Sequence, residues 1–276
     1  MIMAFDLESI KKEKILHAPR IVLAGTEKIG KTSFACGCSF EEGSSKPVAV
    51  GINSPIIIPM DGEEGSDDLE VASFPTVHSY DDLIEALDTL CREDHKLGTV
   101  VLDSASALAP LIDKHVCDEF QVNNIRKVPG FKTGEAAVDI CWRTILKRLD
   151  WLRLNKSMSS IIISHIRIKK HKNPEGDDYD KYDLNVDNGP CEMLKQWADL
   201  ILFANTKVVV KVDGKDTQFS KAKKIGKDIT GGSRFVYTHQ RPAHPGGGRG
   251  VYGQLPYELP LDYKVFSDAV AEAASK

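Results

Sequence analysis

Gly25-Thr26-Glu27-Lys28-Ile29-Gly30-Lys31-Thr32 is the stretch that decides the fold class of this chain. Its pattern is that of a phosphate-binding loop, in which two glycines let successive backbone N–H groups turn toward a polyphosphate. Residues 21–24 are all apolar and predict a buried strand directly before the loop. A helix beginning at Lys31 would add the positive end of its dipole to the same site. Strand, loop and helix together predict an α/β protein that binds nucleotide phosphates.

Individual residues of the loop have separate expected tasks. The Lys31 ammonium can reach the β- and γ-phosphates of ATP, and the Thr32 hydroxyl is placed to hold Mg²⁺. The expected contacts to the nucleotide are Gly25, Thr26, Glu27, Lys28, Ile29, Gly30, Lys31, Thr32 and Ser33. The alternative is a plain glycine turn with an exposed lysine, which predicts no bound nucleotide.

The composition limits the class of protein. A chain of 276 residues is long enough for one large domain, or for one domain with a small appendage. Hydrophobic residues at 42% and charged residues at 28% are ordinary for a globular protein. The formal charge is -4, so no overall basic field draws the chain to nucleic acid. Any binding to nucleic acid must therefore come from local basic patches.

Neither a membrane protein nor a disulfide scaffold is indicated. No apolar stretch approaches the length of a membrane span, and the first twenty residues lack the apolar core of a signal peptide, which predicts a cytosolic protein. The six cysteines show no paired zinc spacing. The closest pair is Cys36-Gly-Cys38, for which packing of the helix against a sheet and a metal or redox role are both open.

Apolar runs and helical periodicities alternate along the first two hundred residues. Buried strands are predicted at residues 56–60, 99–103, 161–164 and 200–204, while residues 48–52 read as a further strand or an irregular lead-in. Helices are predicted at residues 32–40, after a Ser79 cap, around residues 193–197, and in a long segment with Ile140, Ile145, Leu146, Leu149 and Leu152 on one face. This alternation predicts a mostly parallel sheet flanked by helices.

The remaining segments are less regular. Residues 166–190 are rich in charged and turn-forming residues and predict a long mobile loop, with its clearest turn at residues 173–176. Residues 208–219 predict a β-hairpin that turns at Asp213-Gly214. A strand at 233–238, a flexible glycine-rich segment at 245–250 and a closing helix at 265–274 follow.

Two carboxylates stand where strands end. Asp103 closes the strand 99–103, where P-loop ATPases place the acid that orients Mg²⁺. Glu63 follows the strand 56–60 and is the candidate general base for an attacking water, with Glu64 as the neighbour that could take this role instead. The alternative is a solvated acidic face formed by Asp61, Glu63, Glu64, Asp67, Asp68 and Glu70.

Several segments occur in the order and style of the RecA-like recombinase core. They are residues 100–108, Asp61-x-Glu63, residues 162–167, Trp197-Ala198-Asp199-Leu200 and residues 255–261. The chain most resembles the phage-encoded RecA-core ATPases that act in single-strand annealing and recombination. The resemblance implies a lead at residues 1–19 and a RecA-like ATPase domain at 20–276. That domain would have its P-loop core at about 20–205 and a β-rich extension with a β-hairpin at about 206–276.

The resemblance also implies roles for the site residues. Lys31 and Thr32 would bind phosphate and Mg²⁺, Asp103 would be the second acid on the metal side, and Glu63 would activate water. His165 stands where bacterial RecA has a glutamine that senses the γ-phosphate, and an imidazole can hydrogen-bond phosphate as well. From the residues alone, a histidine after an apolar strand is more often a polar strand end than a phosphate sensor, and the resemblance reverses this order.

A DNA-facing segment would follow His165. The basic cluster there consists of Arg167, Lys169, Lys170, His171 and Lys172, and the acids Glu175, Asp177, Asp178 and Asp180 follow it. A second basic region, residues 207–227, holds seven lysines. Both regions could give sequence-tolerant affinity for single strands, and both could be solvated lysine faces without DNA. Arg241 and Arg249 are candidates for a cation supplied to a neighbouring subunit's site.

These observations predict a Mg²⁺-dependent ATPase that binds single-stranded DNA, is stimulated by it, and assembles into a ring or filament with ATP at a subunit boundary. Its setting would be phage recombination or strand annealing in the host cytoplasm, with a single-strand-binding protein as a further partner and no membrane. A P-loop small-molecule kinase is one alternative, although no arginine-bearing lid is identifiable. An ATP-gated DNA-binding module without significant hydrolysis is the other.

Overall fold

The structure is a computed structural model that describes residues 17–39, 54–213, 223–228 and 231–276. For residues 208–213 and 223–228 it describes the backbone path alone. Residues 1–16 of the predicted lead at 1–19 and the predicted segment 48–52 lie outside these ranges.

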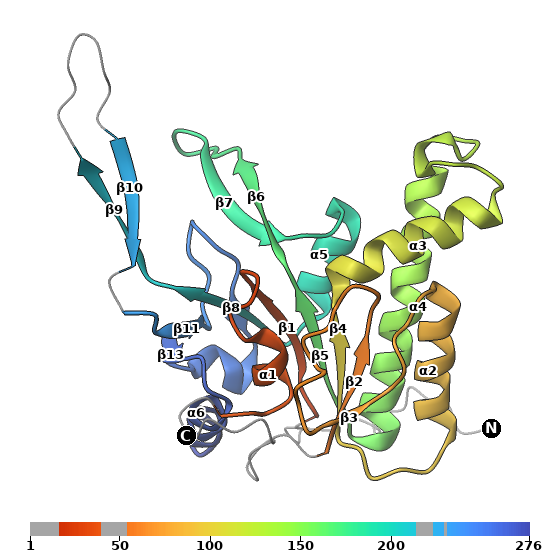
Figure 1. Cartoon of the computed structure of the whole chain (residues 1–276), viewed down its shortest axis with the longest axis horizontal. Helices are drawn as coiled ribbons and strands as arrows, with labels where there is room; N and C mark the ends of the chain where they lie inside the picture. The colour runs from red at the N-terminus through yellow and green to blue at the C-terminus, as the bar shows by residue number, and fades with distance from the viewer. Residues whose placement is uncertain (1–16, 40–53, 214–222, 229–230) are drawn as a thin grey trace, which may run out of the picture.

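A nine-stranded sheet forms the centre of the molecule, in the order β13-β11-β8-β1-β5-β4-β2-β3 with β12 paired to β8 (Figure 1). The strands are β1 Arg20–Gly25, β2 Pro55–Pro59, β3 Ala72–Ser73, β4 Thr99–Asp103, β5 Ser159–Ser164, β8 Leu200–Thr206, β11 Arg234–Tyr237, β12 Gly247–Gly248 and β13 Glu258–Pro260. All pairings from β3 to β8 are parallel, and β11, β12 and β13 add antiparallel pairings at one side. The predicted mostly parallel sheet is confirmed.

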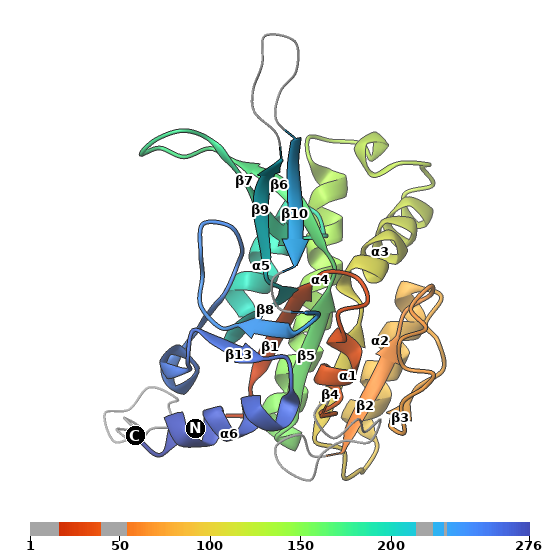
Figure 2. The ribbon, with the colours of Figure 1, turned by 60° about the vertical axis from the view of Figure 1, so that its left-hand side comes forward.

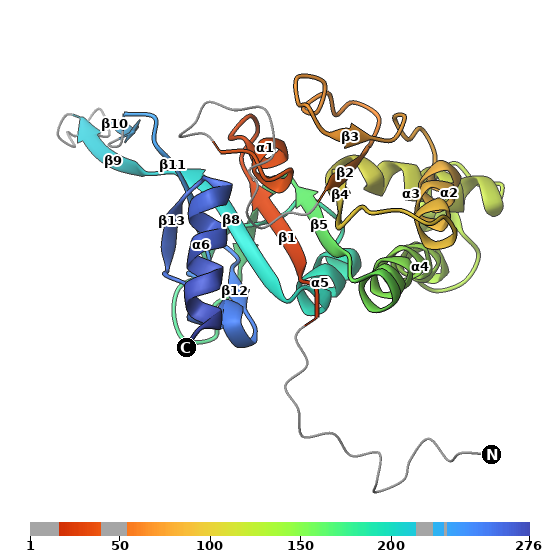
Figure 3. The same cartoon turned by 90° about the horizontal axis from the view of Figure 1, so that it is seen from below.

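Helices cover both faces of this sheet (Figures 1 and 3). They are α1 Lys31–Ala35, α2 Tyr80–Arg92, α3 Ala105–Glu119, α4 Thr133–Lys156, α5 Asn188–Trp197 and α6 Tyr263–Ala274. One buried cluster joins α2, α3, α4 and α5 to the sheet, and a second joins α1 and α6 to the other face. The predicted cap of α2 is confirmed, because the Ser79 side chain accepts a hydrogen bond from the Asp82 N–H. The helix after the phosphate loop ends at Ala35, earlier than predicted.

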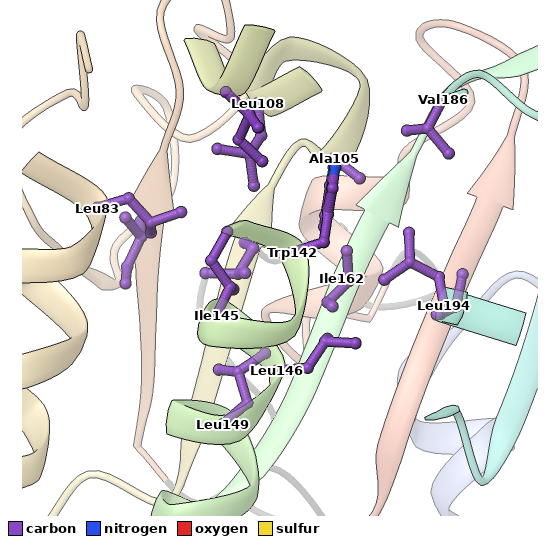
Figure 4. Close-up of a cluster of buried hydrophobic side chains, with 14 of the residues drawn as sticks. Leu83, Ala105, Leu108, Trp142, Ile145, Leu146, Leu149, Ile162, Val186 and Leu194 are labelled. Atoms are coloured by element: carbon purple, nitrogen blue, oxygen red, sulfur yellow. The ribbon is translucent and has the colours of Figure 1, made fainter. Parts of the chain in front are cut away.

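The long helix α4 supplies much of the larger core. Ile145, Leu146, Leu149 and the indole of Trp142 point from α4 toward the sheet (Figure 4). The prediction that Ile140 shares this face is wrong, since its side chain is 61% exposed. At about 3.6 residues per turn, Ile140 lies half a turn away from Leu149 and faces solvent.

The predicted loop at 166–190 is wrong, because this segment contains a β-hairpin and the start of α5. β6 Ile166–His171 pairs antiparallel with β7 Tyr179–Leu184, and the turn predicted at residues 173–176 joins them. The hairpin rises away from the central sheet in Figures 1 and 2. Ile166 and Ile168 alternate with charged residues and lie opposite Leu184 and Tyr182. Lys170 and Asp180 end this alternation, which leaves it too short to predict a strand.

Two further predictions about the carboxyl-terminal part need correction. β9 Val208–Asp213 pairs with β10 Lys223–Asp228, as a hairpin should, but Asp213 lies opposite Lys223, so the two strands are not joined by a two-residue Asp-Gly turn. The glycine-rich segment 245–250 is not simply a flexible linker, because Gly247 and Gly248 form β12 against β8. The strand at β11 and the closing helix α6 are confirmed.

Gly25 allows β1 to approach β8 closely where the phosphate loop begins. A Cβ atom at Gly25 would lie 2.6 Å from the carbonyl oxygen of Ala204, which no side chain tolerates. Gly30 ends the loop with φ 102°, a left-handed conformation that favours glycine. Both glycines of the predicted loop pattern therefore have a structural requirement of their own.

The two isoleucines of α4 provide a matched test of its orientation. Replacing the fully buried Ile145 by Ala should lower the free energy of unfolding by about 2–5 kcal/mol, because it removes apolar contacts and leaves a cavity. The same change at the exposed Ile140 should alter it by about 0.5 kcal/mol or less. Urea denaturation of both variants measures the difference, and equal losses would contradict the orientation of the helix.

Candidate nucleotide-binding site

The candidate site lies at the carboxyl ends of four neighbouring parallel strands. β1 leads into the phosphate loop, β2 is followed by Glu63, β4 ends at Asp103, and β5 is followed by His165. These strands lie side by side in the order β1-β5-β4-β2. Because parallel strands all end at the same edge of a sheet, residues far apart in sequence meet there.

Lys31 is folded back onto its own loop. Its Nζ atom donates hydrogen bonds to the carbonyl oxygens of Gly25 at 3.2 Å and Thr26 at 2.7 Å, and the residue is 5% exposed. Burial lowers the pKa of the Lys31 ammonium, while nearby carboxylates, Asp103 foremost, oppose this shift. The ammonium is thus held at the loop, next to the backbone that would surround a phosphate.

Thr32 and Asp103 bring two oxygen ligands together. The Thr32 hydroxyl donates to Oδ2 of Asp103 at 2.7 Å, and Asp103 is 3% exposed. Burial raises the pKa of Asp103 to about 6, and the charge of Glu63 adds to this shift although the hydrogen bond from Thr32 opposes it. A buried carboxylate with a raised pKa gains from a nearby cation, and Mg²⁺ prefers such oxygen ligands. The pair therefore fits the Mg²⁺ site expected from the sequence.

Glu63 is the member of the acidic segment that turns into the site. Its Oε1 accepts hydrogen bonds from the Ser104 hydroxyl at 2.6 Å and from Nε2 of His165 at 2.9 Å. The bond from His165 is the largest cause that lowers the pKa of Glu63, and it outweighs the opposing effect of burial. Glu63 is consequently an oriented, ionised carboxylate at neutral pH.

The rest of the segment is a solvated face, as the alternative interpretation held. The exposed members are Asp61, Glu64, Asp67, Asp68 and Glu70. Gly65 passes close to the phosphate loop, because a Cβ atom there would lie 2.9 Å from the Thr32 hydroxyl. The segment thus sends one carboxylate inward while its neighbours stay in water.

His165 links this carboxylate to the hairpin that follows it. Besides the bond from Nε2 to Glu63, its Nδ1 lies 4.0 Å from Glu27 of the phosphate loop, and its backbone N–H donates to the Ser106 hydroxyl at 3.0 Å. The hydroxyl oxygens of Ser106 and Ser164 are 3.4 Å apart. Sequence reasoning missed Ser104 and Ser106, because their partners Glu63 and His165 are distant in the chain.

A third residue that sequence reasoning missed supports the loop from β11. The Arg234 guanidinium donates from Nη1 to the carbonyl oxygen of Ile29 at 3.1 Å. The sequence offers no local signal for this contact, because 205 positions separate the two residues.

The predicted DNA-binding residues lie on or just after β6, and most of them have partners. Arg167 and Lys169 both donate to the Asn188 side chain, at 3.2 and 3.0 Å. Lys170 lies 3.6 Å from Asp178 across the hairpin, whereas Lys172 is exposed. The acids that follow the basic cluster in sequence therefore offset part of its charge.

The two candidate trans-acting cations are separated. The Arg241 guanidinium lies over the Tyr257 ring at 4.0 Å. Arg249 donates to the Gln196 carbonyl, beside the start of β8 and therefore at the opposite edge of the sheet from the phosphate loop. Neither arginine has a described contact with the phosphate loop of its own chain.

Cys36 and Cys38 are buried behind the loop, and burial raises the pKa of both thiols. This environment favours the packing interpretation over a redox role, since a reactive cysteine needs a thiolate. Among the described residues, the side chains grouped closely enough to hold a metal ion are Asp183, Cys191 and Glu192, away from this pair.

A phosphate loop between a buried strand and a helix, with carboxylates at the ends of the neighbouring parallel strands, defines an α/β P-loop NTPase. The family comparison agrees: residues 17–250 match the family model described as AAA domain, which spans most of the chain. The chain belongs to this family and is a nucleotide-binding ATPase.

Among solved structures, the crystal structure of the RadB recombinase is similar, at a TM-score of 0.37 and 13% identity, with 78% of this chain and 89% of that chain covered. No match was found among curated proteins. In the described ranges, no helix is both long and apolar enough to cross a bilayer.

Lys31→Ala should abolish stabilisation by ATP, because the cation next to the phosphates is lost. In the native protein, ATP at about a hundred times its Kd should add about 2.7 kcal/mol to the free energy of unfolding. Thermal denaturation with and without ATP and Mg²⁺ measures this effect. Lys28→Ala is the matched control, since Lys28 is exposed on the same loop. Equal stabilisation of both variants would contradict the assignment.

Glu63→Gln should preserve ATP binding and lower the rate of hydrolysis by about 10²–10⁴-fold, the usual contribution of a general base. Glu64→Gln should hydrolyse ATP at nearly the native rate, because Glu64 is exposed. Phosphate release under saturating ATP distinguishes the two. If only the Glu64→Gln variant loses activity, the general base is Glu64 and not Glu63.

Asp103 predicts a specific dependence on pH in protein without nucleotide and Mg²⁺. The pKa of Asp103 is 3.8 in the unfolded chain and about 6 in the folded protein, so the folded state binds this proton more tightly. The free energy of unfolding therefore falls as the pH rises through this interval. An asparagine at this position does not titrate. The free energy of unfolding of Asp103→Asn, relative to that of the native protein, should therefore rise by up to about 3 kcal/mol from about pH 4 to about pH 7. Urea denaturation at both pH values tests this, and a constant difference would contradict it.

Proposed function

We propose that this ATPase is Mg²⁺-dependent, couples hydrolysis to binding of single-stranded DNA, and supports phage recombination or strand annealing. The observation that carries the proposal is the hydrogen bond of 2.9 Å between Glu63 and His165. β6 begins at Ile166, directly after His165. A displacement of the β6–β7 hairpin would therefore move His165, the hydrogen-bond partner of Glu63.

The residues present suggest how hydrolysis proceeds. Lys31 exchanges its two backbone carbonyls for the β- and γ-phosphates. Glu63 accepts a proton from water as the water oxygen attacks the γ-phosphorus, and the bond to the β-phosphate oxygen breaks to release ADP. Thr32 and Asp103 would hold Mg²⁺, which supplies charge stabilisation for the phosphates. His165 keeps Glu63 oriented and responds to the γ-phosphate.

The arrangement of the protruding segments supports DNA binding. The β6–β7 hairpin, the β9–β10 hairpin and the connection between α3 and α4 all rise at the same edge of the sheet (Figure 1). That connection carries Arg126, Lys127 and Lys132, and its Phe131 is 93% exposed. Cations beside an exposed aromatic ring are the combination that binds single strands without sequence preference.

We propose further that the chain is a single ATPase domain that acts as an oligomer. The residues 20–276 form one ATPase domain, with its core at about 20–205, and self-associate into a ring or filament. A neighbouring subunit completes the ATP site with Arg241 or Arg249. The protein acts in the host cytoplasm, together with a single-strand-binding protein.

Neutralising Arg167, Lys169 and Lys170 with glutamine should weaken binding to an oligo-dT and reduce its salt slope by about 2, since each phosphate contact to a single strand contributes about 0.7. ATP binding without DNA should be unchanged. A non-hydrolysed ATP analogue should tighten DNA binding, and DNA should tighten analogue binding by the same factor. Fluorescence anisotropy at several salt concentrations measures these effects.

The matched control replaces Arg92, Lys96 and Lys114 with glutamine, three exposed cations away from the hairpin. It changes the net charge equally and should leave the salt slope intact. If the DNA affinity does not change with salt concentration, with the ATP analogue or in the hairpin triple variant, the proposed DNA-binding function is wrong and only the ATPase activity stands.

A further inference from the structure

A pocket of about 320 Å³ lies between the β6–β7 hairpin, α5 and the connection from β11 to β12. We call it the hairpin pocket. The residues of its lining that matter here are His171, Tyr179, Lys181, Asp183, Lys195 and Arg241. It is separate from the phosphate loop of its own chain, and of its lining residues only Arg241 is a candidate cation for the ATP site of a neighbouring subunit.

The walls of the hairpin pocket are tied together. The Tyr182 N–H of β7 donates to the Ala243 carbonyl at 2.8 Å, which fastens the hairpin to the connection. Phe203 of β8 lies between both walls, stacking on the His244 ring at 4.5 Å and on the Tyr182 ring at 5.5 Å. The pocket is therefore a built feature of the fold and not a gap below a detached hairpin.

The charges of the pocket leave an attraction for an anion. Both carboxylates in the lining contact the same cation, because Lys195 lies 3.2 Å from Asp183 and 2.7 Å from Glu192. Among the described contacts, Lys181 and Arg241 have no carboxylate partner. The Tyr257 ring holds the Arg241 guanidinium in place without neutralising its charge.

An aromatic pair stands at the same wall. His171 and Tyr179 are cross-strand neighbours, and their ring centroids are 4.9 Å apart. Alternation along β6 and β7 places them on the same face of the hairpin as Lys181. Unpaired cations next to aromatic rings, in a volume of this size, suit a ligand that has both a phosphate and a base.

We propose that the hairpin pocket binds one nucleotide unit, with its phosphate held by Lys181 and Arg241 and its base against Tyr179. The unit is either part of a single DNA strand or a free nucleotide. In the first case the inference rests on the proposed function and assigns the strand to the inner face of the hairpin. Occupancy then reaches the ATP site through β6, which begins directly after His165.

The test compares the native protein with Lys181→Ala/Arg241→Ala and with the control Lys114→Ala/Arg92→Ala, which removes the same charge from exposed helix positions. The probes are a fluorescein-labelled oligo-dT, followed by anisotropy across a salt series, and dTMP, followed by equilibrium dialysis. A saturating ATP analogue blocks the phosphate loop in both assays. Tyr179→Leu and Lys181→Gln are single variants that keep the test usable if the double variant does not fold.

The double variant should bind oligo-dT more weakly and lose about 1.4 of the salt slope, for two phosphate contacts. Tyr179→Leu should weaken binding about tenfold, the usual effect of losing one stacked base. The control should match the native protein. ATP hydrolysis without DNA should be unchanged in Tyr179→Leu and Lys181→Gln, neither of which touches a residue proposed for the ATP site.

The outcomes separate this inference from the proposed function. Binding of dTMP that is lost in the pocket variants, without binding of oligo-dT, supports the pocket as a free nucleotide site and overturns the proposed DNA function. Oligo-dT binding that is equal in the native protein and the pocket variants overturns the pocket and leaves the DNA function standing. Failure of the native protein to bind either probe overturns both.

Discussion

The pairing of β5 between β1 and β4 is the constraint on which the site depends. Ile161 and Ile162 of β5 pair with residues of β1 on one side and of β4 on the other, all in parallel register. This register brings the ends of three strands to one edge, where the Thr32 hydroxyl can reach Asp103 across the end of β5. A slip in register would separate the phosphate loop from its carboxylates.

The charged side chains of the site suit the binding of a nucleotide and a cation. Lys31 is satisfied by backbone carbonyls, and Asp103 pays a burial penalty that a hydrogen bond from Thr32 reduces only in part. Glu63, in contrast, is stabilised in its ionised form by His165 and Ser104. Two carboxylates a short distance apart thus have opposite pKa shifts, which matches a division between cation binding and proton transfer.

The basic residues of the β6–β7 hairpin differ in how far carboxylates neutralise them. Charge alone does not define a surface for anions, because Lys170 pairs with Asp178 and Lys195 pairs with two carboxylates. The cations that can attract phosphate are those the fold leaves without a carboxylate, and Lys181 and Arg241 come together from segments sixty positions apart. A linear basic cluster is therefore a weak guide to where an anion binds.

The sequence by itself determined the phosphate loop, the strands β1, β2, β4 and β5, and the Ser79 cap of α2, because these depend on local patterns of glycine, apolar and capping residues. It could not settle that Ile140 faces solvent, that residues 166–184 form a hairpin, or that Glu63 rather than Glu64 turns inward. Those outcomes depend on contacts between segments distant in the chain. Ser104, Ser106 and Arg234 acquire their places for the same reason, since each is positioned by a partner that local sequence does not reveal.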